Sequence, residues 1–107
     1  MSQDAYYLTF KGEPSFDIAA EIFEEILMDA YNVDWMPELA TEADEVEDSL
    51  APYFDNCEVS EFDADDLAKA LIRVEREVDF IGRAEYEAAL LEMIRITAQG
   101  AFTIHRR

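Results

Sequence analysis

The sequence predicts one α+β domain over residues 1–107, mainly helical, with about four helices and a small antiparallel pair made by an N-terminal and a C-terminal strand. The length is the first reason, because 107 residues suffice for one hydrophobic core and are too few for two. Secondly, apolar residues recur at helical spacing in three stretches, 17–31, 62–79 and 83–98. Thirdly, runs rich in aromatic and β-branched residues stand near the two chain ends, at 5–10 and 101–104.

The first half of the chain begins with a strand, a turn and a helix. Residues 5–10 alternate between more and less polar side chains, which is typical of a strand with one buried face, and residues 11–14 are turn formers. Either Ser15 or Asp17 then offers an N-cap for a helix that ends near Tyr31. The predicted apolar face of this helix is Ala19, Ile22, Phe23, Ile26, Leu27 and Ala30.

The middle of the chain is less regular. Residues 32–39 are expected to be irregular, because Pro37 blocks the continuation of a helix. A short, very acidic helix is predicted at 41–53, ending near Pro52. Residues 55–61 are expected to form a loop or a short extended piece.

A longer helix is predicted at 62–79. Asp63 is its expected N-cap, and Phe62 is expected to pack on Leu67 as a hydrophobic staple. Its predicted buried stripe is Leu67, Ala70, Leu71, Val74 and Val78.

The last helix is predicted at 83–98 and ends before Gly100, a residue suited to a helix stop. Its predicted buried residues are Tyr86, Ala89, Leu90, Met93, Ile94 and Thr97. The strand at 101–104 pairs most simply with the strand at 5–10, which would bring the two chain ends together.

The dominant feature of the composition is negative charge. The chain has 26 Asp and Glu against 8 Lys and Arg, a formal net charge of −18, well above the magnitude of about 2–8 that keeps a small domain soluble. Residues 1–60 hold 16 acids and one base, whereas residues 61–107 hold 10 acids and 7 bases. We therefore do not expect the chain to bind nucleic acid or an anionic membrane directly, because its carboxylates would repel phosphate groups.

Several absences narrow the function classes. No apolar run reaches the roughly 18 residues of a membrane-spanning helix, and the first residues do not resemble a secretory signal, so the cytoplasm is the expected compartment. Cys57 is the single cysteine, which excludes an internal disulfide and a thiol-based zinc site. His105 is the single histidine, which removes paired-histidine metal sites and most nucleophile–histidine machinery. We expect no metal and no cofactor.

The residues that could carry catalysis are poorly placed for it. His105 stands beside two arginines at the chain end and is expected to be a solvated tail residue. Cys57 has acidic neighbours, which raise the pKa of a thiol, so a buried or inert thiol is expected. Asp63 begins an acid-rich run of the kind found in calcium loops, but Val74 stands where an EF-hand has its Glu. No enzyme is predicted.

The remaining signal is the acidic surface itself. Carboxylates at helical spacing form rows whose separations approximate those of the phosphates along a nucleic-acid strand, so a Lys- and Arg-lined groove would accept them. The predicted partner-binding residues are Asp17, Glu21, Glu24, Glu25, Glu38, Glu42, Asp44, Glu45, Glu47 and Asp48. Nearby aromatic residues and Met36 are candidate interface anchors, although Trp35 fits a core position better.

In size, charge and helix-rich make-up the whole chain resembles the small, very acidic phage proteins that imitate DNA, among them anti-CRISPR and anti-restriction inhibitors. The resemblance implies stoichiometric inhibition of a basic nucleic-acid-binding complex, such as a nuclease, a CRISPR effector or a restriction enzyme, in the host cytoplasm. The resemblance implies no catalytic residue in this chain.

Three alternatives stay open. The chain could be an immunity protein or antitoxin that neutralises a basic nuclease. It could be the solvated domain of a halophile, although the near balance of charge in residues 61–107 argues against that. The triplet at 48–50 resembles the attachment site of acyl carrier proteins, with Ser49 as the position for a prosthetic group, but Pro52 follows where that family has a long helix. The oligomeric state is also open, with a dimer among the options.

Overall fold

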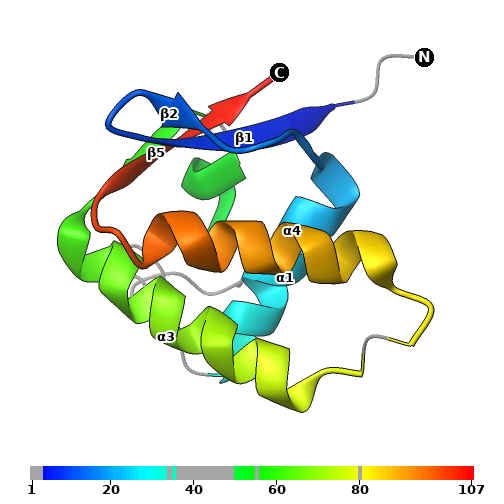
Figure 1. Ribbon diagram of the computed structural model, residues 1–107. Coiled ribbons are helices and arrows are strands. Elements are labelled where there is room, and N and C mark those ends of the chain that lie inside the picture. The colour runs from blue at the N-terminus through cyan, green and yellow to red at the C-terminus, as the bar shows by residue number, and fades with distance from the viewer. Residues whose placement is uncertain (1–3, 34, 36–49, 55, 80) are drawn as a thin grey trace.

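A small antiparallel sheet lies against a layer of helices in the computed structural model, which describes residues 4–33, 35, 50–54, 56–79 and 81–107 (Figure 1). In chain order the elements are β1 (Ala5–Phe10), β2 (Glu13–Pro14), β3 (Ile18–Ala19), α1 (Ala20–Val33), the 3-10 turn η2 (Ala51–Phe54), β4 (Cys57–Val59), α3 (Glu61–Glu77), α4 (Ala84–Thr97) and β5 (Phe102–Arg106). Helices α1 and α4 contact β1, and α3 packs on both of them.

The sheet is larger than predicted, so the expected fold of about four helices with a two-stranded pair is wrong. β1 and β5 do pair, with Leu8 opposite Ile104. β4 extends the sheet beyond β5, while β2 and β3 both pair with the other edge of β1, giving five antiparallel strands. The described residues contain three α-helices. β2 and β3 were missed because each has only two residues, too few to show an alternating pattern.

The predicted helix at 41–53 lies largely outside the described residues. Its described end, Ala51–Phe54, is a 3-10 turn. The segment at 55–61 contains β4, which agrees with the short extended piece expected as one of two options there.

The turn after β1 is confirmed, but the predicted N-cap of α1 is wrong. Lys11 and Gly12 have φ angles of 51° and 81°, the left-handed pair that a tight hairpin turn requires. The chain then returns along β1, and α1 begins only at Ala20. Ser15 is buried beside β1, where its Oγ accepts a hydrogen bond from the Leu8 N–H at 2.9 Å. Asp17 precedes β3 and so cannot cap the helix.

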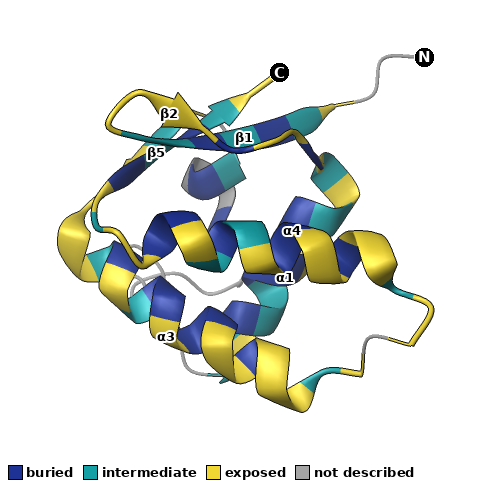
Figure 2. Cartoon of the chain, in the orientation of Figure 1, coloured by how far each residue is buried: buried dark blue, intermediate teal, exposed yellow. Residues whose placement is uncertain are grey.

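The apolar stripes of the helices are largely confirmed (Figure 2). In α1 the buried residues are Phe23, Ile26, Leu27 and Ala30, and in α3 they include Leu67, Ala70, Leu71 and Val74. In α4 the predicted residues are buried apart from Ile94, which is half-buried. Ala19 is exposed, because it belongs to a strand and not to the helix.

The predicted start of α3 is wrong in two details. Ser60 is the N-cap, and its side chain accepts a hydrogen bond from the Asp63 N–H at 3.2 Å. Phe62 is 74% exposed and therefore does not form the expected staple on Leu67. The reason is that the N-cap lies three residues earlier than predicted, so Phe62 falls within the first turn of the helix instead of preceding its cap.

Aromatic side chains hold the core together between the sheet and the helices. Tyr6 of β1 stacks on Phe23 of α1, with ring centroids 4.5 Å apart. Trp35 is 1% exposed and meets Tyr53 edge-on at 5.1 Å. The expectation that Trp35 belongs to the core is thus confirmed, while Met36 lies outside the described residues.

Candidate functional site

Four of the ten predicted partner-binding acids lie in the described residues, and all four are exposed. They are Asp17, Glu21, Glu24 and Glu25. The other six, Glu38, Glu42, Asp44, Glu45, Glu47 and Asp48, fall in the segment 36–49, outside the described residues, as does Ser49.

The described acids do not form the single helical row that their spacing predicted. Glu21, Glu24 and Glu25 belong to α1, but Asp17 stands before β3, so a strand separates it from the helix. Asp17 is instead bound to the other end of the chain, where Arg107 donates from Nε to its Oδ1 at 3.0 Å. Glu25 forms an ion pair with Arg83. Among the described residues, Glu21 and Glu24 make no ion pair, so they are the uncompensated part of this surface.

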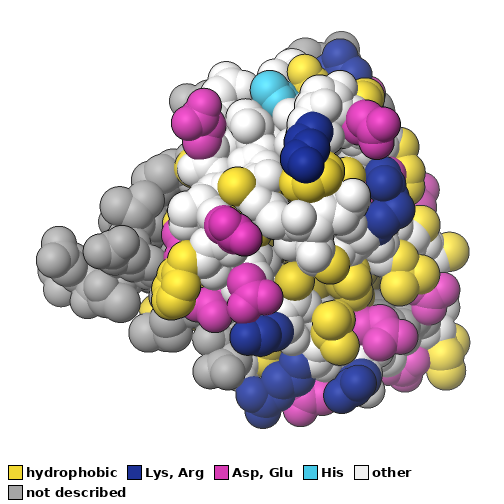
Figure 3. All heavy atoms as spheres, turned by 60° about the vertical axis from the view of Figure 1, so that its left-hand side comes forward, with side chains coloured by type: hydrophobic (Ala, Val, Ile, Leu, Met, Phe, Trp, Pro, Cys, Tyr) yellow, Lys and Arg dark blue, Asp and Glu magenta, His cyan; other side chains and the backbone are white. Residues whose placement is uncertain are grey.

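Most of the chain's positive charge is already bound to its own carboxylates. All eight Lys and Arg lie in the described residues, and six of them form ion pairs with Asp or Glu there. Figure 3 shows Lys and Arg side chains set among Asp and Glu on one side of the molecule. With six of the eight cations paired in this way, the remaining carboxylates of the chain far outnumber the two other cations, Lys11 and Arg76.

Two of these arginines are also held by aromatic rings. The Arg83 guanidinium lies 4.1 Å from the ring centroid of Tyr86, and that of Arg107 lies 4.4 Å from the ring centroid of Tyr7. The Tyr86 hydroxyl donates to Asp29 at 2.6 Å. Burial, and then this hydrogen bond, raise the pKa of Tyr86 above its ordinary value, so the phenol keeps its proton.

The outer face of the sheet holds a strip of side chains that sequence reasoning missed. The predicted solvated tail residue, His105, is in fact half-buried in β5. Its ring stacks on Tyr7 with centroids 4.6 Å apart, and its Nε2 lies 2.8 Å from the Thr9 Oγ1. The cross-strand pairing of Tyr7 with His105 creates this contact, and only the register of β1 on β5 could have predicted it.

The surroundings of the single thiol agree with the predicted rise in its pKa. Cys57 is half-buried, and burial, followed by the nearby Asp63 and Glu58 carboxylates, raises its pKa. A thiol in these surroundings is a poor nucleophile at neutral pH. Within the described part of the chain, no cluster of three or more His, Cys, Asp or Glu side chains could hold a metal ion.

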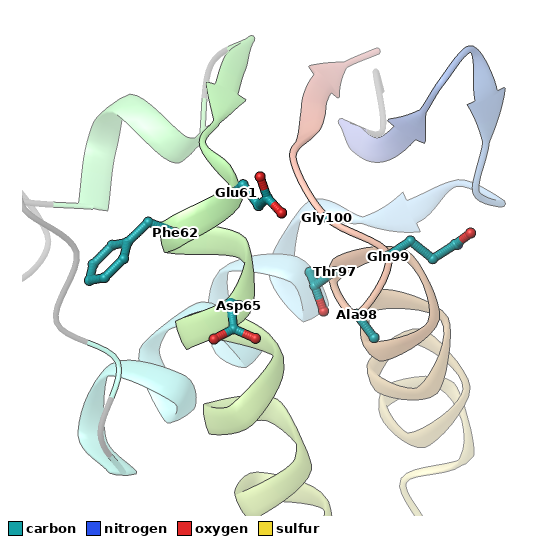
Figure 4. A pocket seen from close by; sticks show the side chains of 7 residues that line it. All are labelled: Glu61, Phe62, Asp65, Thr97, Ala98, Gln99 and Gly100. Atoms are coloured by element: carbon teal, nitrogen blue, oxygen red, sulfur yellow. The ribbon is translucent and has the colours of Figure 1, made fainter.

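A surface groove of about 460 Å³ lies between the start of α3 and the end of α4. Figure 4 shows Glu61 reaching from α3 toward Gly100, while the Phe62 ring lies on the other side of the helix. Asp65 also lines the groove, but its carboxylate is bound to Lys69 at 2.9 Å. The groove is open, and the two charged residues that line it, Glu61 and Asp65, are both acidic.

A smaller groove, about 260 Å³, lies between the start of α1 and α4. Its lining combines apolar side chains with two carboxylates, those of Asp17 and Glu85. Of the four predicted site residues that the structure describes, Asp17 alone lines it.

None of the helices in the described residues is both long and apolar enough to cross a membrane. Comparison of the chain with protein-family models, with curated proteins and with solved structures found no match.

Proposed function

We propose that this chain is a non-enzymatic binding protein whose acidic surface occupies the basic nucleic-acid site of a partner, as a DNA mimic does. The preferred version is an inhibitor of a defence complex, of anti-CRISPR or anti-restriction type, acting in the cytoplasm of the host. The observation that carries the proposal is the net charge of −18, of which residues 1–60 contribute −15.

The ion pairs support this proposal. Because six of eight cations are engaged by the chain's own carboxylates, few cations remain to bind a partner's acids. A surface with one uncompensated sign of charge attracts the opposite sign over long range and speeds association. A groove built for phosphates supplies that opposite sign.

The described part of the proposed interface centres on Glu21 and Glu24. Both are exposed on α1 and make no ion pair within the described residues. Asp17 and Glu25 each already form one internal ion pair, with Arg107 and Arg83, and so contribute less uncompensated charge.

The first experiment is affinity capture from a bacterial lysate that contains nucleases and defence complexes, after its nucleic acid has been digested. We expect a basic DNA- or RNA-binding complex that elutes as salt is raised and that added duplex displaces. Capture of a single cognate nuclease toxin would instead favour the immunity-protein alternative. Recovery of no nucleic-acid-binding protein, from bait shown to be folded, would contradict the proposal.

A matched pair of variants then locates the interface. Charge reversal by Glu21→Lys and Glu24→Lys should weaken binding of the captured partner at least tenfold. The control, Glu75→Lys with Glu87→Lys, changes the net charge equally at exposed positions of α3 and α4 and should bind nearly as the wild type does. Full binding by a folded Glu21→Lys/Glu24→Lys variant would show that these residues of α1 are not part of the interface.

A further inference from the structure

The groove between the start of α1 and α4 has the size and lining of a site for one side chain. Its volume of about 260 Å³ lies below the roughly 300–1,000 Å³ typical of small-molecule sites. Ile18 and Ala89 are buried beneath it, and exposed Ala88 keeps it open because a methyl group fills little space. The half-exposed ring of Phe16 also lines it.

The charge along the groove favours a cation. Asp17 and Glu85 contribute carboxylates to the lining, whereas no Lys or Arg, all of which the structure describes, lines it. Glu85 is exposed and forms no ion pair with any described residue. An apolar slot with carboxylates at its rim suits a side chain that has an apolar stem and a positive head.

The chain's own arginines show how such a head is held. Arg83 is bound by the Glu25 carboxylate and lies over the Tyr86 ring. Arg107 is bound by Asp17 and lies over the Tyr7 ring. In both places a guanidinium contacts one carboxylate and one aromatic ring face. The planar, delocalised guanidinium of Arg suits such a site better than the compact ammonium of Lys does.

We infer that this groove binds an arginine side chain of the basic partner, an inference that rests on the proposed function. Its methylene stem lies along Ile18, Ile22 and Ala88, and its guanidinium reaches the groove's carboxylates beside the Phe16 ring. Because Arg107 already holds Oδ1 of Asp17, Glu85 provides the main ion pair.

The test is an NMR titration of the full chain with Nα-acetylarginine amide, using the uncharged citrulline analogue as the control ligand. We expect amide shifts confined to residues 16–22 and 85–89 and no response to the citrulline compound. Shifts spread over exposed carboxylates throughout the molecule, or absent from the groove, would overturn the inference.

Two neighbouring glutamates of α4 give a matched pair of variants. Glu85→Gln removes a carboxylate from the groove, and Glu87→Gln removes one from the same exposed turn outside the lining. We expect Glu85→Gln to weaken arginine amide binding at least fivefold and Glu87→Gln to leave it within twofold. Ala88→Leu, which fills the groove without changing charge, should abolish binding. Unchanged binding by Glu85→Gln and Ala88→Leu would overturn the inference.

The same variants separate this inference from the proposed function. If a nucleic-acid-binding partner is captured and displaced by duplex, yet Ala88→Leu binds it fully, the groove is not the anchor and the proposed function stands. If arginine amide binds in the groove but no nucleic-acid-binding protein is captured, the proposed function fails and the arginine site stands.

Discussion

Ser15 hydrogen-bonds to β1 at the point where the main chain passes from β2 to β3. Its backbone N–H donates to the Leu8 carbonyl at 2.7 Å, while its Oγ accepts from the Leu8 N–H and donates to the Phe16 carbonyl. The backbone N–H and the backbone carbonyl of buried Leu8 are thereby both hydrogen-bonded to Ser15. The chain can therefore leave β1 after β2 and return to it as β3.

Replacing Ser15 by Ala should lower the free energy of unfolding by about 2 kcal/mol, because the buried Leu8 N–H would lose its acceptor. Urea denaturation measures the change. Ser60→Ala, which removes the N-cap of α3, is the comparison and should cost about 1 kcal/mol. A loss from Ser15→Ala no larger than that from Ser60→Ala would contradict this role.

Glu92 of α4 is hydrogen-bonded to the segment that precedes β3. Its carboxylate accepts from the Arg95 Nε at 2.6 Å and from the Phe16 N–H at 3.3 Å. The hydrogen bond from Arg95 is the main cause that lowers the pKa of Glu92 below its ordinary value of 4.5, with the Phe16 N–H adding to it. A group whose pKa is lowered by folding stabilises the protein above its unfolded-state pKa, and this contribution is lost as the pH falls through the folded-state value.

Glu92→Gln should therefore cost about 1 kcal/mol of unfolding free energy at pH 7, and the difference from wild type should shrink as the pH falls below about 4.5. Urea unfolding over a descending pH series measures it, at low protein concentration because the pI is about 4.1. Glu75→Gln, an exposed change on α3 that alters the net charge equally, is the control and should cost less at pH 7 than Glu92→Gln does. A cost that stays constant with pH would contradict the role of the charge.

At the scale of the element, the beginning of α3 divides into an exposed and a buried side. Phe62 is 74% exposed, whereas Leu67 is 1% exposed and packs in the core. Ser60 and the first-turn acids Glu61 and Asp63, which favour a helix N-terminus, start the helix without help from the Phe62 ring.

Phe62→Ala should change the free energy of unfolding by less than about 0.5 kcal/mol. Leu67→Ala should cost about 2–5 kcal/mol, because it leaves a cavity between α3 and its neighbours. Thermal and urea unfolding of the two variants checks this. A cost above about 1 kcal/mol for Phe62→Ala would contradict this view and support a stabilising contact between Phe62 and Leu67.

At the scale of the whole molecule, the net charge opposes folding, because the carboxylates repel one another. The molecule measures 34 × 31 × 31 Å and carries a net charge of −18. At about 10 mM salt the screening length is about 30 Å, so carboxylates across the whole molecule repel one another, whereas at about 150 mM it is about 8 Å. Salt should therefore stabilise the fold without being required for it, because the described residues share one continuous hydrophobic core.

We expect the chain to be folded at about 10 mM NaCl and its Tm to rise by about 5 °C at about 150 mM, the shift that about 1 kcal/mol produces in a domain of this size. Circular dichroism at increasing salt measures both quantities. A chain that is unfolded at low salt and folds only at molar salt would instead support the halophile alternative.

The features that could be predicted from the sequence are those whose signal is local. Helical periodicity predicted most of the buried faces of α1, α3 and α4, and the amino-acid composition contains the charge surplus. The pairing of the two- and three-residue strands could not be predicted, because each is defined by hydrogen bonds to a partner strand and is too short to carry a pattern. The tertiary structure also decided which acids are compensated: Arg83 and Glu25 are 58 residues apart in sequence, and Arg107 and Asp17 are 90 apart. Side-chain periodicity repeats within an element, whereas ion pairs and strand pairing depend on how distant elements meet.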